Sequence, residues 1–109
     1  MAITVQDSGT QTAVVSTEHT LETVTGLGVY QLFVDCSNLA LGDTVVVRIY
    51  CKVLSGSSSA IMFEASYSHP QSYVVKASEP VTNPYELVFK LEQTGGSARD
   101  FEWSVVKIG

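Results

Sequence analysis

Few side chains in this sequence have the types and spacing that acid, base or nucleophilic chemistry requires. The chain has two histidines, His19 and His69, and thirteen serines. A serine nucleophile needs a histidine base beside it, and none of the serines lies in the G-x-S-x-G elbow of α/β-hydrolases. Each histidine lies at the edge of a predicted strand among polar residues. We therefore interpret both as exposed surface imidazoles.

Two carboxylates in a cleft would be enough for glycosidase chemistry. All eleven acidic residues fall in predicted loops or on outward strand positions, which favours a solvated role. The sequence contains no D-x-[DN]-x-[DN]-G calcium loop, no phosphate loop at Gly95-Gly96 and no His-x-His pair of the kind that a cupin metal site uses. We predict no catalytic, metal-binding or cofactor-binding residue and a protein that is not an enzyme.

The two cysteines, Cys36 and Cys51, have neither CxxC nor Cys/His metal-binding spacing. They fall on consecutive predicted strands that we expect to pair across Leu41-Gly42-Asp43, so a disulfide is conceivable. The N-terminus lacks the charged and apolar regions of a signal peptide, which predicts folding in a cytoplasm. Reduced, packed thiols are therefore the expectation.

The elements that position these residues are predicted to be strands. The chain has 16 valines, 4 isoleucines and 10 threonines against 8 leucines and 7 alanines, a bias that favours strands over helices. A helix over 17–25 is an alternative that its threonine content disfavours. Turns are expected at Asp7-Ser8-Gly9 and 93–98, with an irregular loop between Pro80 and Pro84. The predicted strands are 2–6, 11–16, 19–25, 29–36, 44–54, 60–68, 72–77, 85–92 and 99–108.

Turn signals about every ten residues are typical of an all-β sandwich or barrel. We predict one domain over 1–109, an antiparallel two-sheet sandwich of the jelly-roll kind, with a closed small barrel as the alternative. Residues 1–17 are either an N-terminal arm or an edge strand. Period-two alternation also places Cys51, Val53 and Ile61 inward. The predicted core is Phe33 or Leu32, Val45, Val47, Ile49, Phe63, Leu87, Phe89, Phe101 and Trp103.

Outward positions suggest how the domain contacts other molecules. Val46 and Val88 are apolar on nominally polar faces, and with Tyr50 they form our candidate oligomer interface. Tyr50, Tyr73 and Phe33 are the aromatics expected to be exposed, which is few for a sugar-binding platform. A net charge of −5 argues against binding to nucleic acid or an anionic membrane surface. No apolar stretch is long enough to span a membrane.

Two blocks carry a family likeness. They are GVYQLFVDCSNLALGDTVVVRIYCKV at 28–53 and NPYELVFKLEQTGGSARDFEWSVVKIG at 83–109. Each combines strands with defined turns: Asp-x-Ser-Asn-Leu and Gly-Asp in the first, Gln-Thr-Gly-Gly before Phe-x-Trp-Ser-Val in the second. This pattern, covering about half of the chain, resembles the small capsid cement proteins of tailed bacteriophages, also called decoration or head-stabilising proteins. The matched motifs are turns and core residues, so no catalytic residue is carried over.

The resemblance implies a non-enzymatic virion protein on the capsid surface, made in the cytoplasm of a bacterial host. Its partner would be the major capsid protein, and it would be a homo-oligomer, a trimer ahead of a dimer. The alternative function is a carbohydrate- or surface-binding module of a phage tail or a secreted protein. A cupin-type enzyme is a third alternative, which the isolated histidines disfavour.

Overall fold

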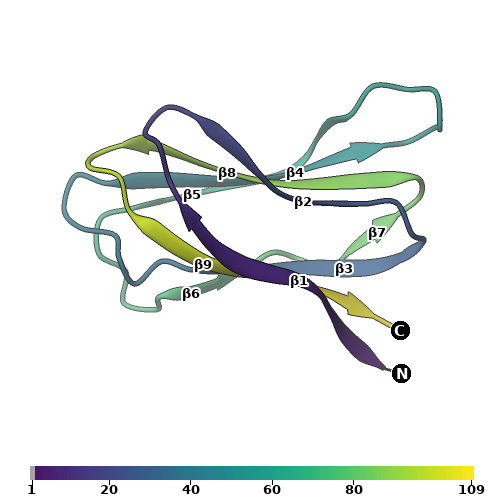
Figure 1. The fold of residues 1–109 in the computed structure, drawn as a ribbon, viewed down its shortest axis with the longest axis horizontal. Helices are drawn as coiled ribbons and strands as arrows, with labels where there is room; N and C mark the ends of the chain where they lie inside the picture. Colours follow the sequence, from purple (N-terminus) through teal and green to yellow (C-terminus); the bar gives the residue numbers. More distant parts are fainter. Residues whose placement is uncertain (1) are drawn as a thin grey trace.

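The structure, a computed structural model, describes residues 2–109 and contains nine strands and no helix in that range (Figure 1). No segment of the described chain is a helix that could cross a membrane. The strands are β1 (Ile3–Thr12), β2 (Glu18–Val24), β3 (Gly28–Asp35), β4 (Thr44–Lys52), β5 (Ala60–Ser68), β6 (Val75–Ala77), β7 (Val81–Asn83), β8 (Glu86–Gly95) and β9 (Asp100–Ile108).

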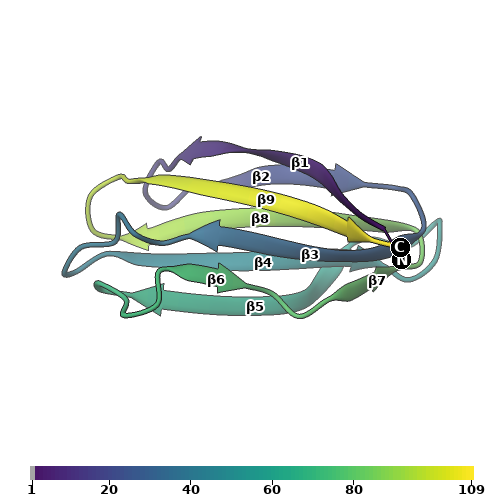
Figure 2. The same cartoon turned by 90° about the horizontal axis from the view of Figure 1, so that it is seen from below.

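The strands form two antiparallel sheets packed face to face: Figure 1 shows the two layers edge-on, and Figure 2 looks through them face-on. The five-stranded sheet has the order β1-β9-β3-β6, with β7 also paired to β3, and the four-stranded sheet has the order β2-β8-β4-β5. The shortest extent of the molecule, 18 Å, runs across the strands of each sheet, as expected for four neighbouring strands that lie about 4.8 Å apart. The predicted all-β two-sheet sandwich is confirmed, and the chain does not close into one barrel.

The jelly roll stays a prediction. The strand order is compatible with it, because the chain passes repeatedly from one sheet to the other and β6 and β7 together would take the place of one strand. Only β4 to β5 and β6 to β7 connect strands within the same sheet.

Alternating side chains of both sheets fill the space between them. Of the two residues offered for one core position, Leu32 is buried and Phe33 lies half-buried on the outer face. Phe63 and Trp103 pack against the core but are only partly buried, because β5 is an edge strand and Trp103 lies against Gly9 of the edge strand β1. The fully buried members of the predicted core are Val45, Ile49, Leu87, Phe89 and Phe101, with Val47 at 4% exposure.

The turn predicted at residues 7–9, the loop predicted between Pro80 and Pro84 and the start of the turn predicted at 93–98 were wrong. Asp7-Ser8-Gly9 is not a turn: β1 runs through it, and Gln6 forms a bulge between the pairs Val5–Val106 and Asp7–Val105. The loop between Pro80 and Pro84 contains β7, and β8 continues through Gln93 to Gly95. The strand predicted over 19–25 is confirmed as β2, which spans Glu18–Val24, and the alternative of a helix over 17–25 was wrong.

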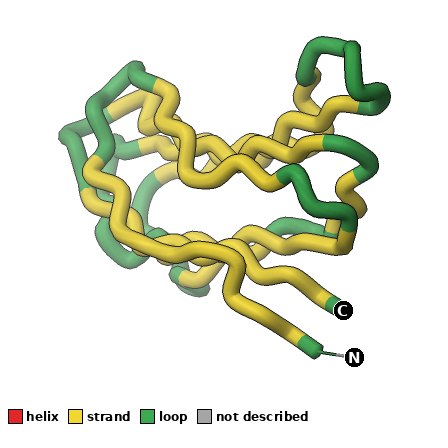
Figure 3. The backbone as a smooth tube through the Cα atoms, turned by 45° about the vertical axis from the view of Figure 1, so that its right-hand side comes forward, coloured by secondary structure: helices red, strands yellow, loops and turns green. Residues whose placement is uncertain are grey.

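The inward alternation also ends earlier than predicted. Val53 is 70% exposed because the tip of the β4–β5 hairpin bends away from the opposing sheet (Figure 3). Ile61 is 51% exposed because the bulge at Met62 shifts the register of β5 and pairs Ile61 with Tyr50, which faces outward. Both cysteines are free thiols. Cys36 follows β3 and Cys51 lies on β4, and these strands belong to different sheets, so the expected pairing across residues 41–43 was wrong. Burial raises the pKa of the Cys36 thiol to about 11.

Asp43 joins the connections at one end of the sandwich, and our expectation of a solvated side chain was wrong, because only 1% of this residue is exposed. Its Oδ2 accepts hydrogen bonds from Ala40 N at 2.9 Å and Arg99 Nε at 2.7 Å, and its Oδ1 accepts one from Ser97 N at 3.2 Å. The bond from Ala40 N and that from Arg99 outweigh burial and lower the pKa of Asp43. The carboxylate therefore stabilises the fold above the ordinary aspartate pKa, and this contribution is lost as the pH falls through the lowered pKa.

The side chain of Gln93 forms hydrogen bonds with backbone groups of the β8–β9 turn, at the same end of the sandwich as Asp43. The side chain is fully buried, its Nε2 donates to Gly95 O and Ser97 O, and its Oε1 accepts from Arg99 N. A buried amide with these partners orders the β8–β9 turn, since leaving any of these groups unpaired would cost free energy. Gly96 in this turn has a φ of +86°, and a Cβ there would overlap Asp43.

Phe89→Ala is expected to lower the free energy of unfolding by about 3–5 kcal/mol, because the ring is fully buried at the centre of the sandwich. Val53→Ala, which truncates an exposed side chain, is the control and should change it little. Chemical denaturation followed by tryptophan fluorescence measures both. A loss below about 1 kcal/mol for Phe89→Ala would mean that the register of β8 is wrong.

Gly96→Ala and Gly42→Ala separate backbone strain from displacement of Asp43. Both glycines have positive φ, +86° and +92°, but an added Cβ at position 42 meets no atom within 4 Å. Gly42→Ala should therefore cost about 1–2 kcal/mol of unfolding free energy from strain alone. Gly96→Ala should cost clearly more, because Asp43 must also move. Equal losses in urea denaturation would show that Asp43 is not held as described.

Candidate functional site

The three residues predicted as an interface lie on the outer face of the four-stranded sheet. Tyr50 of β4 and Val88 of β8 are direct cross-strand neighbours, and both are half-buried. Val46 points to the same face, since Val45 and Val47 on either side of it belong to the core. Only 7% of Val46 is exposed, so it offers little surface to a partner. Their role in an interface stays a prediction.

Most of this face is occupied by charged side chains that pair with one another. Arg48 Nη1 donates to Glu18 Oε2 and Glu92 Oε1, both at 2.8 Å, and its Nε donates to Glu64 Oε2 at 2.6 Å. We call Arg48, these three glutamates, Lys90 and Tyr50 the Arg48 cluster. Its members come from all four strands of the sheet, so the cluster crosses the whole face.

Lys90 and Tyr50 complete the cluster. Lys90 Nζ lies 3.6 Å from Glu18 Oε1 and 4.6 Å from the centroid of the Tyr50 ring, and the Tyr50 hydroxyl donates to Glu18 Oε2 at 2.9 Å. Partial burial acts to raise the pKa of Glu18, but the hydrogen bonds from Arg48 and Tyr50 and the charge of Lys90 lower it overall. The hydrogen bonds from Glu92, Glu64 and Glu18 raise the pKa of Arg48. The charges of this face therefore satisfy one another.

The sequence predicts that the side chains of this cluster face outward, but it does not predict which strands lie side by side. Period two correctly placed Arg48, Tyr50 and Glu64 outward, and Lys90 and Glu92 alternate with the core residues of β8. The missing information is the register of strands far apart in the chain, such as Arg48 opposite both Glu64 and Lys90. Neither pairing follows from local sequence.

Exposed apolar side chains gather at one end of the sandwich. Lys52 pairs with Glu86, Gly28 with Asn83 and Ile3 with Ile108. This end therefore contains the start of β1, the end of β9, the β2–β3 and β7–β8 connections and the tip of the β4–β5 hairpin (Figures 1 and 3). Eight of the thirteen large apolar or aromatic residues classed as exposed lie here: Ile3, Val5, Leu27, Val53, Leu54, Ile61, Met62 and Tyr85. We call this set the apolar end.

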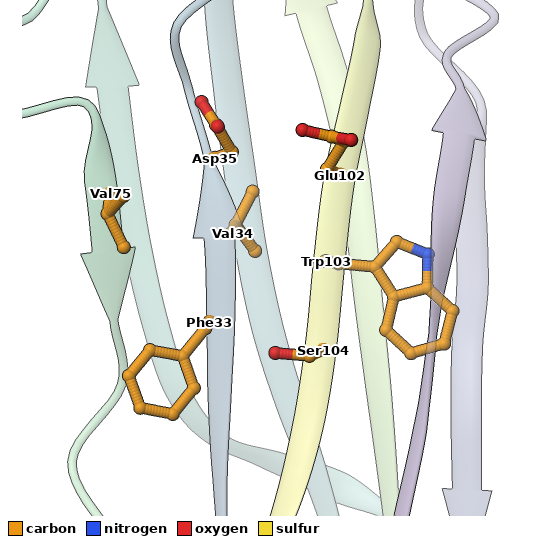
Figure 4. Close-up of a pocket in the computed structure, with 7 residues that line it drawn as sticks. All are labelled: Phe33, Val34, Asp35, Val75, Glu102, Trp103 and Ser104. Atoms are coloured by element: carbon orange, nitrogen blue, oxygen red, sulfur yellow. The ribbon is translucent and has the colours of Figure 1, made fainter. Parts of the chain in front are cut away.

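The outer face of the five-stranded sheet carries an open groove with a volume of about 200 Å³. Phe33 and Asp35 of β3, Val75 of β6, and Glu102 and Ser104 of β9 line it (Figure 4). Figure 4 shows Asp35 and Glu102 at the same end of the groove on neighbouring strands, while the Trp103 indole points away toward β1.

The two acidic residues of the groove lie opposite each other. The register pairs Phe33 with Ser104 and Val34 with Trp103, and one further step brings Asp35 opposite Glu102. Directly opposed residues of an antiparallel pair have their Cβ atoms about 5 Å apart on the same face. Both residues were predicted to be exposed to solvent, but their proximity depends on the pairing of β3 with β9, which local sequence does not predict.

The predicted surface histidines both accept backbone hydrogen bonds. His19 Nε2 accepts from Val14 N and His69 Nδ1 accepts from Gly42 N, each at 3.0 Å. Within residues 2–109, no group of three or more His, Cys, Asp or Glu side chains is arranged to hold a metal ion.

Arg48→Gln is expected to lower the free energy of unfolding by about 1–3 kcal/mol at pH 7, because three glutamates would lose their common cation. Glu64 is about half exposed, so solvent screening favours the low end of that range. Wild-type stability from the cluster is lost as the pH falls through the lowered pKa of Glu18. The difference between variant and wild type should therefore shrink in acid.

Urea denaturation between pH 7 and about pH 3 measures this difference. Lys107→Gln removes the same charge outside the cluster and is the control. A loss that is independent of pH, or an equal loss for the control, would contradict the described cluster.

No protein-family model, no curated protein and no solved structure matches this chain. A function is therefore proposed from its own residues and from the resemblance that the sequence suggests at 28–53 and 83–109.

Proposed function

We propose that this chain is a non-enzymatic structural protein that binds the outside of an assembled phage capsid and stabilises it. Its partner in this proposal is the major capsid protein, and its location is the surface of the virion, after synthesis in the cytoplasm of the bacterial host. The single observation that supports the proposal most is the apolar end. Leu27, Val53 and Leu54, which are 64–71% exposed, need a partner if they are to leave water.

The position of the apolar end fits a docking role. Its side chains come from both sheets and from three separate connections, so a partner that covered it would contact several elements of the domain at once. Apolar side chains gathered in this way are typical of surfaces that bind other proteins. The Asp43 connections lie at the opposite end of the strands and would keep the docking end in a fixed shape.

The net charge of the chain and the repetition of sites on a shell are compatible with the same proposal. The net charge of −5 disfavours contact with packaged DNA. A protein that binds only the assembled, expanded shell stabilises that state by mass action. On a shell, many copies with modest contacts act together, so no single interface has to be large.

We further propose that the protein acts as a homo-oligomer, a trimer ahead of a dimer. Tyr50 and Val88 remain the candidate contact residues, since Val46 beside them is covered within the subunit. Light scattering over a range of concentrations reports the oligomeric state. A monomer at every concentration would restrict assembly to the capsid surface.

The alternative, a carbohydrate- or surface-binding module, has less support. Sugar platforms on sandwich folds present several aromatics on one face, whereas the exposed Tyr73 and Tyr85 and the half-buried Tyr50 and Phe33 are separated from one another here. Tyr50 and Phe33 lie on the outer faces of different sheets, and Tyr73 and Tyr85 lie in connections. No observation specifically favours this alternative.

The proposal predicts that particles carrying this protein keep their DNA at a higher temperature than particles that lack it. Leu54→Ser in the β4–β5 hairpin should weaken binding to expanded particles, because it makes the apolar end more polar. Leu41→Ser is the matched control, since Leu41 is 83% exposed but lies in the β3–β4 connection, at the other end of β4. Sedimentation of labelled protein with expanded particles and thermal release of DNA are the two measurements.

Wild type and Leu41→Ser should bind alike, and Leu54→Ser should bind less. If the labelled protein fails to sediment with particles, and DNA is released at one temperature with and without it, the capsid proposal is wrong. Equal binding by both variants would move the contact away from the apolar end.

A further inference from the structure

The groove on the five-stranded sheet holds two negative charges that the subunit does not neutralise. Asp35 and Glu102 lie on neighbouring strands at the same end of the groove, and like charges in opposed positions of a sheet destabilise it. Within residues 2–109, neither carboxylate forms an ion pair. Asp35 Oδ1 accepts one hydrogen bond, from Ser37 N at 2.8 Å. The contrast with the paired charges of the Arg48 cluster indicates that a cation is expected from outside.

The nearest lysine along the groove is turned to the other side of the sheet. Lys76 of β6 pairs with Val34, a core residue, and its Nζ lies 5.0 Å from the centroid of the Tyr67 ring on the opposing sheet. It therefore faces the gap between the sheets, while Asp35 and Glu102 face outward. Lys76 could reach the groove only by leaving the Tyr67 ring and crossing to the other face of the sheet.

The remaining lining residues restrict what the external cation is. A volume of about 200 Å³ is below the range of about 300–1,000 Å³ typical of small-molecule pockets, so a single side chain fits better than a cofactor. Phe33 offers an aromatic ring and Val75 an aliphatic surface, 61% exposed, that an aliphatic stem would cover. A planar guanidinium pairs with two carboxylates through several N–H groups at once, which a compact ammonium does less well.

We propose that this groove binds the side chain of an arginine presented by a protein partner, with the guanidinium at Asp35 and Glu102 and the stem along Phe33 and Val75. The identification of that partner with the capsid protein rests on the proposed function, whereas the recognition of arginine does not. A single solvent-exposed site of this kind binds weakly, and repetition over a shell would make it effective.

The test uses the whole chain, labelled with nitrogen-15, and blocked Gly-Arg-Gly, Gly-Lys-Gly and Gly-citrulline-Gly peptides followed by NMR. Citrulline keeps the shape of arginine without its charge. The arginine peptide should shift the amide signals of residues 33–35, 75 and 102–104 in a saturable manner, the lysine peptide should bind more weakly, and the citrulline peptide should leave these signals unchanged. Equal shifts with citrulline, or shifts spread over both sheets, would overturn the inference.

Two variants test the assignment to residues. Glu102→Gln and Phe33→Ser should each weaken arginine-peptide binding by about three- to tenfold, since the first removes one carboxylate and the second removes the apolar surface along the stem. Glu22→Gln makes the same charge change on the other sheet and should leave binding unchanged. Glu102→Gln should also keep or raise the melting temperature, by up to about 4 °C, because it removes a like-charge neighbour. Equal weakening by Glu22→Gln would reduce the effect to general electrostatics and overturn the site.

Binding to expanded particles then separates this inference from the proposed function. Weaker particle binding by Glu102→Gln than by Glu22→Gln would support both. Peptide binding without particle binding would sustain the arginine site and overturn the capsid proposal. Particle binding without arginine-peptide binding would sustain the capsid proposal and overturn the arginine site.

Discussion

The buried carboxylate of Asp43 is the interaction on which the arrangement of the two sheets most depends. It lies where the chain crosses from β3 in one sheet to β4 in the other, and it accepts hydrogen bonds from the turn between β8 and β9, which crosses in the opposite direction. The backbone of Asp43 also accepts a hydrogen bond from His69 N, at the end of β5. The carboxylate thus joins two connections and the backbone of the same residue joins a third, and the requirement that a buried charge be fully paired explains the positions of Arg99 and Ser97.

The two outer faces of the sandwich differ in whether their charged side chains are paired within the subunit. On the four-stranded sheet, Arg48 and Lys90 neutralise most of the charge of three glutamates within the subunit, so the face is polar but nearly self-sufficient. On the five-stranded sheet, Asp35 and Glu102 are left together beside an aromatic ring. Surface charge that is already paired gives a partner little to gain, whereas unpaired charge beside an apolar surface favours an external cation.

The sheet edges make pairing with the main chain of another molecule unfavourable. Each of the long edge strands contains a bulge, at Gln6 in β1, Leu21 in β2 and Met62 in β5, and the remaining edge consists of the short strands β6 and β7. Bulges and short strands interrupt the regular row of N–H and C=O groups that a foreign strand would need. Contacts with neighbours are thus directed to side chains, at the apolar end and in the groove, in preference to strand edges.

Local patterns in the sequence were enough to predict most of the strands and most of the core. Alternation with period two placed Val45, Ile49, Leu87, Phe89 and Phe101 inward because a residue's face in a strand depends only on local spacing. Local spacing could not show that burial ends before Val53, nor that the bulge at Met62 turns Ile61 outward. It also could not show that distant turns would enclose Asp43. Tertiary structure alone decided which strands are neighbours and in what register. The Arg48 cluster and the opposition of Asp35 to Glu102 both depend on pairing between strands far apart in the chain, and no residue's own neighbours in sequence encode that register.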